Sequence, residues 1–304
     1  MVSNPVDSLN RREKMTWLLL DVSYLAHRAM YTTGSLSHKG ESTGALYGLF
    51  RSVFALRNQF DTDYVCWCFD DRTDNLYRKR DYPPYKVTRS KTSIDPLWKK
   101  TKKELNRQIN RLRQEILPQA KCPNIGFEKG YEADDVIAWY VWGIQQTMKD
   151  STAIIVTADE DLFQLVTRNG ISVSVYNPSK KKRTTENTFH REHGFSPKLW
   201  PAYKSLAGCS SDNIPGIRGI GPKAAGDFLR LGAYALPPKK RELIERGKEE
   251  RTLFESLASL PYHNDGVPNG ELVPEIKKDK NESSKEWQDV FRSLGFTSFL
   301  PQRH

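Results

Sequence analysis

The stretch T-W-L-L-L-D at residues 16–21 is a short apolar run that ends on an aspartate. Two further runs share this form. One is Y-V-C-W-C-F at 64–69, which Asp70 follows, and the other is A-I-I-V-T at 153–157, with Asp159 two residues later. Continuous apolar runs of this length predict strands that are buried on both faces, as in a parallel sheet. We therefore expect an α/β fold with a mostly parallel central sheet.

The segments between and beyond these runs predict helices and an edge hairpin. Apolar residues recur every three or four positions over 44–60, 99–117 and 133–148. Residues 171–183 alternate and then turn, which predicts the hairpin. After residue 188 the strand signal fades, and short helices broken by Gly and Pro follow. We expect an α/β core over 15–188 and a helical region over 189–304.

Acidic residues follow the predicted strands. The carboxyl ends of parallel strands meet at one edge of a sheet, so Asp21, Asp70 and Asp159 are expected to converge there. Other acids lie close in the sequence: Glu132, Asp134, Asp135 and Asp161. Each of these alone is typical of a helix cap. Together they would repel one another unless divalent cations were bound. Hard oxygen ligands favour Mg²⁺ or Mn²⁺. Clusters of this kind hold two ions in phosphodiester-cleaving enzymes.

The positive charge is concentrated in one sixth of the chain. Residues 72–121 hold 15 Lys and Arg against five Asp and Glu, a difference of +10 that equals the net charge of the whole chain. Aromatic residues interleave with this charge: Tyr77, Tyr82, Tyr85 and Trp98. A charge run alone is typical of a solvated helix face. Aromatic faces among cations instead favour contact with single-stranded nucleic acid.

A glycine-rich loop follows in the second half of the chain. Residues 214–225 read I-P-G-I-R-G-I-G-P-K-A-A. A dinucleotide-binding loop is excluded because no strand precedes these glycines and the G-x-G-x-x-G spacing fails. A G-I-G turn between short helices is instead typical of a helix-hairpin-helix element, which grips a duplex backbone through its amide groups.

Composition narrows the class of protein further. No apolar run reaches the roughly 20 residues that a membrane helix requires, and residues 1–14 lack the apolar centre of a secretory signal. The four cysteines form no C-x-x-C pair, which favours a reducing compartment. We expect a cytoplasmic monomer that contacts no membrane.

Five blocks give the chain a resemblance to the 5′-nuclease (flap endonuclease) family, of the bacteriophage type and of the 5′-nuclease domain of bacterial family-A DNA polymerases. They are L-L-L-D at 18–21, F-D-D at 69–71 with the basic stretch 77–89, G-Y-E-A-D-D-V-I-A at 130–138, T-A-D-E-D-L-F-Q-L at 157–165, and residues 206–225. The end, F-R-S-L-G-F-T-S-F-L at 291–300, is also similar. The resemblance implies a PIN-like sheet, a basic arch over about 71–121, and no fused polymerase. Residues 1–14 precede the family register.

The resemblance also implies roles for residues of this sequence. It assigns metal binding to Asp21, Asp70, Glu132, Asp134, Asp135, Asp159, Asp161 and Asp212. It makes Lys86 and Arg78, together with Asp70, the catalytic residues at the base of the arch. DNA contacts are implied for Tyr82, Tyr85, Arg89, Gly216, Gly219, Gly221 and Lys223, and the family's loop at 216–223 also holds K⁺. The expected partners are DNA with 5′ flaps, 5′ ends or single-strand/duplex junctions, or an RNA–DNA hybrid, in replication or repair.

One position departs from the family pattern. The family usually reads G-D-x-S-D-N where this chain has Gly208-Cys209-Ser210-Ser211-Asp212-Asn213. A neutral thiol is a poor ligand for Mg²⁺, so we expect weaker binding of the second ion, or a preference for Mn²⁺.

Three functions are consistent with these patterns. The first is a two-metal 5′→3′ exonuclease and 5′-flap endonuclease, which the resemblance favours. The second is a catalytically impaired protein that binds DNA junctions, with Cys209 as the sign of decay. The third is a single-strand ribonuclease on the same acid-lined sheet, which the G-I-G loop disfavours because that loop is suited to a duplex.

Overall fold

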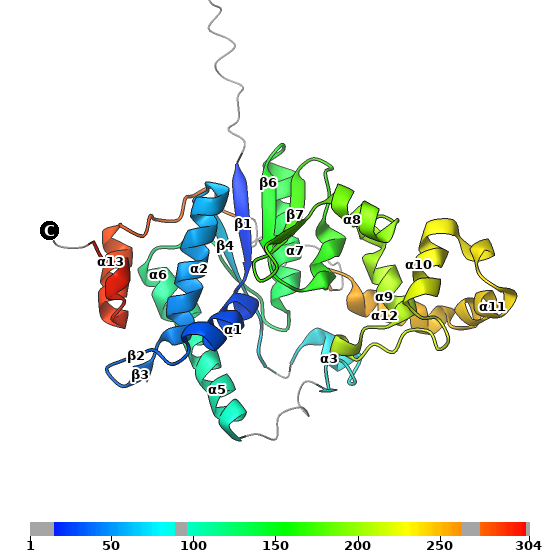
Figure 1. Ribbon diagram of the computed structural model, residues 1–304, viewed down its shortest axis with the longest axis horizontal. Helices are drawn as coiled ribbons and strands as arrows, with labels where there is room; N and C mark the ends of the chain where they lie inside the picture. Colours follow the sequence, from blue (N-terminus) through cyan, green and yellow to red (C-terminus); the bar gives the residue numbers. More distant parts are fainter. Residues whose placement is uncertain (1–14, 74, 89–95, 263–273, 302–304) are drawn as a thin grey trace, which may run out of the picture.

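A six-stranded sheet forms the centre of the molecule (Figure 1). The computed structural model describes residues 15–301 except 74, 89–95 and 263–273. The sheet order is β5-β4-β1-β6-β7-β8, with strands β1 (Thr16–Asp21), β4 (Tyr64–Phe69), β5 (Ile125–Phe127), β6 (Thr152–Val156), β7 (Ser172–Asn177) and β8 (Lys182–Thr184). Neighbouring strands are parallel except for the β7–β8 hairpin at the edge. The predicted mostly parallel α/β fold and its edge hairpin are confirmed.

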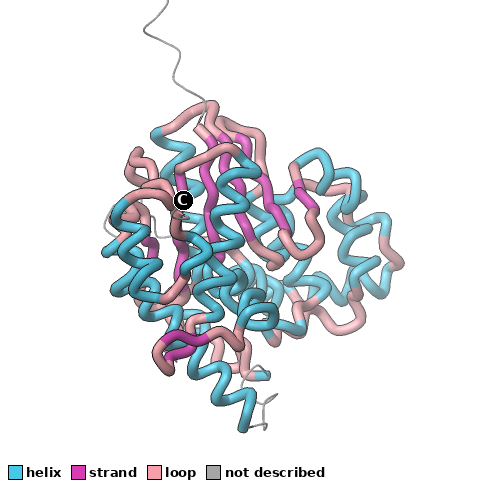
Figure 2. The backbone as a smooth tube through the Cα atoms, turned by 60° about the vertical axis from the view of Figure 1, so that its left-hand side comes forward, coloured by secondary structure: helices cyan, strands magenta, loops and turns pink. Residues whose placement is uncertain are grey.

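Strand β1 divides its side chains between two hydrophobic cores. Leu18 and Leu20 point to one face of the sheet, and Trp17 and Leu19 point to the other, because successive side chains of a strand alternate. All four are fully buried. Helices therefore cover both faces of the sheet, which Figure 2 shows from a second direction.

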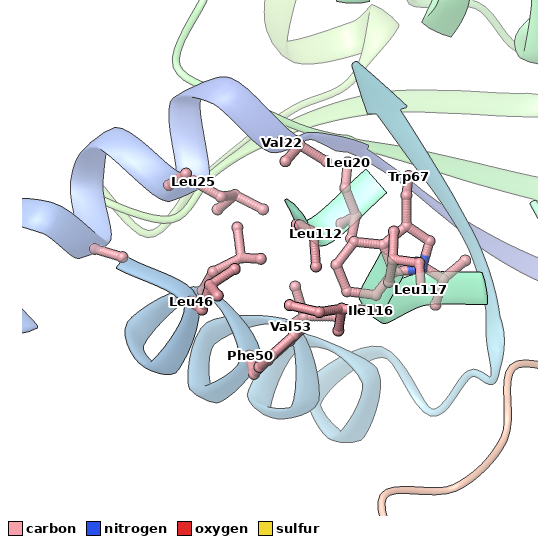
Figure 3. Close-up of a cluster of buried hydrophobic side chains, with 14 of the residues drawn as sticks. Leu20, Val22, Leu25, Leu46, Phe50, Val53, Trp67, Leu112, Ile116 and Leu117 are labelled. Carbon is pink, nitrogen blue, oxygen red and sulfur yellow. The ribbon is translucent and has the colours of Figure 1, made fainter. Parts of the chain in front are cut away.

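The first core lies under several helices, which Figure 3 shows in close-up. Phe50 and Val53 of α2 pack there with Leu112 and Ile116 of a π-helical turn and with Trp67 of β4. The elements on this side are α1 (Val22–Thr33), α2 (Gly44–Phe60), α5 (Pro96–Arg111), η2 (Leu112–Ile116) and α6 (Leu117–Gln119). A small hairpin, β2 (Ser37–His38) with β3 (Glu41–Ser42), connects α1 to α2.

The second core lies on the opposite face, under α7 (Ala133–Thr147) and the 3₁₀ turn η3 (Glu160–Leu165). Val136, Ile137 and Ile144 of α7 are fully buried against β1 and β6. Glu132 begins α7 as its N-cap, in a capping box with Asp135. The apolar stripe of α7 thus fixes its N-terminus next to the carboxyl edge of the sheet.

The residues after the hairpin form a helical region beside the sheet, at the right of Figure 1. Its elements are α8 (Glu186–His193), η4 (Pro197–Leu199), α9 (Trp200–Ala207), η5 (Ser210–Asp212), α10 (Pro222–Leu231), η6 (Ala233–Ala235), α11 (Pro238–Arg246) and α12 (Lys248–Ala258). Leu206, Ala225 and Ile244 join α9, α10 and α11 in a core of their own. Helix α3 (Tyr77–Asp81) also lies at this side, below the sheet edge (Figure 1).

The chain then returns from this helical region to the first core. Helix α13 (Lys285–Leu294) buries Trp287 and Phe291 completely against Phe50 and Phe54 of α2, and the turn η8 (Thr297–Phe299) follows it. The amphipathic pattern of α13 predicts a helix, but it does not indicate which of the two cores the helix packs against. Among the described helices, none is both long and apolar enough to cross a membrane.

Candidate active site

Five aspartates line one cavity at the carboxyl edge of the sheet; four of them are predicted metal ligands, and the fifth is Asp71. Asp21 is the last residue of β1, Asp70 directly follows β4, and Asp159 follows β6 and caps η3. Asp134 reaches the same cavity from the first turn of α7. The cavity has a volume of about 630 Å³. The predicted convergence of acids from three strands and one helix is therefore present in the structure.

Short hydrogen bonds from neighbouring elements hold two of these carboxylates. Asp21 accepts from the Tyr24 amide at 2.9 Å and from the Thr157 hydroxyl at 2.8 Å. Asp70 accepts from the Ala133 amide at 2.9 Å and from the Ser23 hydroxyl. The donors come from α1, α7 and the end of β6, so the edge of the sheet and two helix N-termini position the acids together.

The electrostatics of the four aspartates favour a bound cation. Burial, and then the charge of Asp70, raise the pKa of Asp21 to about 7. Burial and the charges of Asp159 and Asp21 raise the pKa of Asp134 well above its ordinary value. A divalent cation would offset this repulsion, and carboxylate oxygens are the ligands that Mg²⁺ and Mn²⁺ prefer.

The donor set fits a hard divalent ion in its chemistry. Within the described residues, no three His, Cys, Asp or Glu side chains are close enough to enclose one ion.

Four cations line the same cavity as the aspartates, and we call them the cationic wall. They are Lys86, Arg72, Lys79 and Lys102, and Tyr85 lines the cavity as well. The Lys86 ammonium lies 2.6 Å from Glu132 Oε1 and 3.6 Å from Asp212 Oδ1. Lys86 adopts a left-handed backbone with φ of 54°, and its amide donates to the Asp212 carbonyl at 3.0 Å. A strained lysine held in this way is typical of a functional site.

Glu132 joins the cationic wall to the N-terminus of α7. Its Oε2 accepts from the Tyr85 hydroxyl at 2.9 Å and from Arg78 at 3.4 Å. Burial by itself would raise the pKa of Glu132, but Lys86 and Arg78 hold that pKa below its ordinary value. Glu132 is therefore an ionised carboxylate that already has cationic partners.

Two predicted site residues, Arg78 and Asp135, form a buried ion pair instead of facing the cavity. Arg78 donates to both oxygens of Asp135, at 2.7 and 2.9 Å, and to the carbonyls of Leu257 and Ser259. Asp135 is fully buried and also accepts from the Tyr262 amide. Neither is among the described residues that line the cavity. Arg78 thus neutralises Asp135 directly, and the roles expected for these two residues stay predictions.

Asp161 and Asp212 form a second group beside the cavity, around Cys209. Asp161 is paired with the Lys204 ammonium, which lies 3.6 Å from the Cys209 sulfur. Cys209 Sγ lies 3.4 Å from Asp212 Oδ2 and 3.0 Å from the Ser211 hydroxyl. This second group thus contains a buried cation and a thiol in addition to its two carboxylates.

The glycine loop joins α9 to α10 in a tight turn. Gly216 and Gly219 have φ of 69° and 89°, and a Cβ at Gly216 would lie 2.4 Å from the Gly208 nitrogen. Gly221 precedes α10 with an extended backbone, and a Cβ there would meet no atom within 4 Å. The first two glycines are required by the turn itself, whereas Gly221 leaves backbone open to a partner at the start of α10, next to Lys223.

Comparison with known proteins identifies the family. The family model described as the 5′-3′ exonuclease N-terminal, resolvase-like domain matches residues 16–194. A 5′-3′ exonuclease of Aquifex aeolicus (strain VF5) is 35% identical over 216 residues, which cover 71% of this chain and 69% of that protein. The chain belongs to the 5′–3′ exonuclease family.

The chain is also similar to part of a larger protein. DNA polymerase I of Caldicellulosiruptor bescii is 32% identical over 261 residues, which cover 81% of this chain and 29% of the polymerase. The chain thus spans less than a third of the polymerase that it matches. Among solved structures, the T5 D15 protein co-crystallised with metal ions has a TM-score of 0.65 at 17% identity and covers 81% of this chain and 90% of that chain. The catalytic core of Rad2 in complex with DNA has a TM-score of 0.53 at 15% identity, and the match covers 94% of this chain and 88% of that chain. These two likenesses concern the fold.

The remaining predicted residues of this family member are placed as follows. Tyr85 lines the cavity, but Tyr82 packs against Phe254 of α12, with ring centroids 6.1 Å apart. Arg89 and residues 1–14 lie outside the described residues, as does part of the expected arch.

Sequence reasoning missed Ser23, Thr157 and Arg72. Ser23 and Thr157 hydrogen-bond Asp70 and Asp21, and Arg72 donates to Ser23 at 2.8 Å. Their nearness to the strand ends is a signal, since Ser23 follows Asp21 by two residues and Thr157 precedes Asp159 by two.

Proposed function

We propose that this chain hydrolyses DNA phosphodiesters as a divalent-metal-dependent 5′→3′ exonuclease and 5′-flap endonuclease. One observation carries the proposal: Asp21, Asp70, Asp134 and Asp159 line the same cavity as the four cations of the cationic wall. The acids suit metal ions, and the cations suit a phosphate backbone. The family assignment supports the 5′→3′ direction, and the T5 and Rad2 neighbours, solved with metal ions and with DNA, support metal-dependent action on DNA.

The four cavity aspartates would hold the catalytic cation, Mg²⁺ or Mn²⁺. A bound divalent ion lowers the pKa of water and neutralises charge on a phosphate. The residues of this chain then do the positioning. Ser23 and Thr157 fix the carboxylates of Asp70 and Asp21, and the capped N-terminus of α7 fixes Asp134.

Lys86 is the cation best placed to act on the scissile phosphate. It lines the cavity, its side chain is only 10% exposed, and Glu132 holds its ammonium in place. A preorganised ammonium in a site of low dielectric stabilises the negative charge that develops on the phosphate. Arg78 has a positioning role, since it binds the carboxylates of both Asp135 and Glu132.

A second metal ion would bind more weakly than the first. Its expected ligands, Asp161 and Asp212, already lie close to Lys204 and Lys86, and Cys209 supplies a thiol where the family has a carboxylate. A soft thiol binds Mg²⁺ poorly. We therefore propose tight binding of one ion, and weaker binding of a second, with Mn²⁺ preferred over Mg²⁺.

The glycine loop would bind the duplex part of the substrate. Gly219, Gly221 and Lys223 would present amides and a cation to phosphates, and loop carbonyls would hold K⁺. The substrates proposed are DNA with 5′ flaps, free 5′ ends or single-strand/duplex junctions, and an RNA–DNA hybrid in the same geometry. The chain would act on them as a monomer.

Cleavage of a 5′-labelled flap duplex with Mg²⁺ or Mn²⁺ tests the proposal. We expect product ends near the junction with the wild-type protein, no product without metal, and a loss of at least a hundredfold in Asp134→Asn. Asp289→Asn is the matched control, because Asp289 is exposed on α13 and pairs with Arg292. Metal-independent binding without cleavage by the wild type would contradict the proposal and support the junction-binding alternative, and cleavage of single-stranded RNA alone would support the ribonuclease.

A further inference from the structure

A series of side-chain hydrogen bonds joins Asp70 to helix α5. Asp70 Oδ2 accepts from the Ser23 hydroxyl, and the Ser23 oxygen accepts from Arg72 Nη2 at 2.8 Å. Arg72 Nη1 in turn donates to the side-chain carbonyl of Asn106. Ser23 belongs to α1, Asn106 to α5, and the other two residues to the segment after β4. We call these four residues the Asp70 relay, and all of them line the cavity of the aspartates.

The chemistry of the groups fixes the direction of each hydrogen bond in the Asp70 relay. A guanidinium only donates and a carboxylate only accepts. The Ser23 hydroxyl has a single proton, so it must donate to Asp70 while it accepts from Arg72. Asn106 must present its carbonyl oxygen to the guanidinium. Since no bond of the relay can reverse, the relay favours one orientation of Asp70 Oδ2.

The other oxygen of Asp70 is held from a different element. Oδ1 accepts from the Ala133 amide, in the first turn of α7, at 2.9 Å. The two hydrogen bonds together fix the plane of the Asp70 carboxylate. Because the Ser23 hydroxyl lies between Arg72 and Asp70, the guanidinium orients the carboxylate through a neutral group. Partners of this kind behind a metal ligand set its orientation and its affinity for the ion.

The far end of the relay rests on a part of α5 that is firmly packed. Leu105, the neighbour of Asn106, is 1% exposed in the first core. Gln108 is equally buried, donates to the Ser42 hydroxyl at 3.1 Å and accepts from the Leu46 amide at 3.4 Å. Contacts on both sides of Asn106 therefore hold its carbonyl at a fixed place from which it can orient Arg72.

We propose that Arg72 and Asn106 are positioning residues for the metal ligand Asp70. Through Ser23 they hold the Asp70 carboxylate in the orientation that binds a divalent ion, so a side chain of α5 sets the metal affinity from a distance. The inference rests on the proposed function, since it takes the cavity aspartates as the metal site. If the relay only joined α5 to α1, it would affect stability and leave metal affinity unchanged.

A calorimetric titration with Mn²⁺ in the absence of DNA tests the proposal. Asn106 is the best residue to change, because loss of the Arg72 charge would by itself strengthen the attraction for a cation. Mn²⁺ binding should weaken about tenfold in Ser23→Ala, the usual effect of losing a partner behind a metal ligand. Asn106→Ala, which acts from further away, should weaken it severalfold. Wild-type affinity in Asn106→Ala would overturn the inference.

The matched control is Asn110→Ala, because Asn110 is an exposed asparagine one turn further along α5. Its Mn²⁺ affinity should equal that of the wild type. Thermal unfolding in EDTA should show that Asn106→Ala and Asn110→Ala are both folded. An equal loss of Mn²⁺ affinity in the two variants would also overturn the inference, since it would place the effect on the helix as a whole.

A double variant separates the relay from two independent effects. If Asn106 acts through Ser23, the variant with both Ser23→Ala and Asn106→Ala should bind Mn²⁺ no more weakly than Ser23→Ala alone. Losses that multiply would refute the relay while leaving the nuclease proposal intact. A wild type without a saturable Mn²⁺ site would instead refute the proposed metal site, and the role of the relay with it.

Discussion

At the scale of single residues, Cys209 departs from the expected family pattern. Its thiol lies beside Asp212 and Lys204, where a carboxylate would increase the negative charge available to a second cation. We predict that Cys209→Asp lowers the Mg²⁺ concentration for half-maximal flap cleavage severalfold. Cys209→Ser, which adds no charge, should leave it close to that of the wild type. Equal Mg²⁺ curves for the Asp and Ser variants would contradict this explanation.

Asp279 provides a pH test outside the proposed active site. It is 4% exposed, and burial raises its pKa to about 7 in spite of nearby Cys122 and Arg57. The unfolded chain releases this proton near pH 4, so the folded protein loses stability as the pH rises from about 4 to 7. At about 1.4 kcal/mol per pKa unit, the loss amounts to a few kcal/mol at most.

Asp279→Asn should remove this loss. We predict that its Tm exceeds that of the wild type at pH 8 and that the difference shrinks at pH 5, as measured by thermal unfolding in EDTA. The exposed Asp289→Asn should show no such trend. A Tm for Asp279→Asn that lies below the wild type equally at both pH values would contradict the assignment.

At the scale of elements, the glycine loop contains one glycine that the fold requires and another that we expect to contact DNA. Gly216→Ala places a Cβ against the Gly208 nitrogen and the Leu206 carbonyl at a φ of 69°, which should cost about 1–3 kcal/mol of stability. Gly221→Ala meets no atom within 4 Å, so its Tm should not change, but its methyl group should weaken binding to duplex DNA. Fluorescence anisotropy and thermal unfolding check the two effects. Unaltered duplex affinity in Gly221→Ala would argue against this loop as the duplex contact.

The elements also show what local sequence can predict. The β1, β4 and β6 strands, helix α2 and the β7–β8 hairpin are clear from periodicity, because each pattern records burial along a short segment. The packing of α13 against α2 was not predictable, since its apolar stripe fits any hydrophobic surface. The Arg78–Asp135 ion pair was not predictable either, because a sequence motif does not show which of its charged residues pair in the folded chain.

At the scale of the whole molecule, the net charge of +10 arises from residues 72–121, and much of it lies on α5. Neutralising a phosphate contributes about 0.7 to the salt slope for a single strand. We predict that replacing Lys99, Lys100 and Lys103 with Ala reduces the slope of log affinity against log salt by about two for a single-stranded flap. Replacing Lys149, Lys277 and Lys285, which are exposed outside α5, should change it little. Equal slopes for the two triple variants would show that α5 does not bind the strand.

The central claim is that the four cavity aspartates bind the catalytic metal, and a calorimetric titration with Mn²⁺ in the absence of DNA tests it most directly. Wild type and Asp289→Asn should show a saturable site that is lost or at least tenfold weaker in Asp134→Asn. Since Asp134 is destabilised by burial and by like charge, its Asn variant should be no less stable than the wild type in EDTA, which rules out misfolding as the cause. Mn²⁺ binding of wild-type strength by a folded Asp134→Asn would contradict the account.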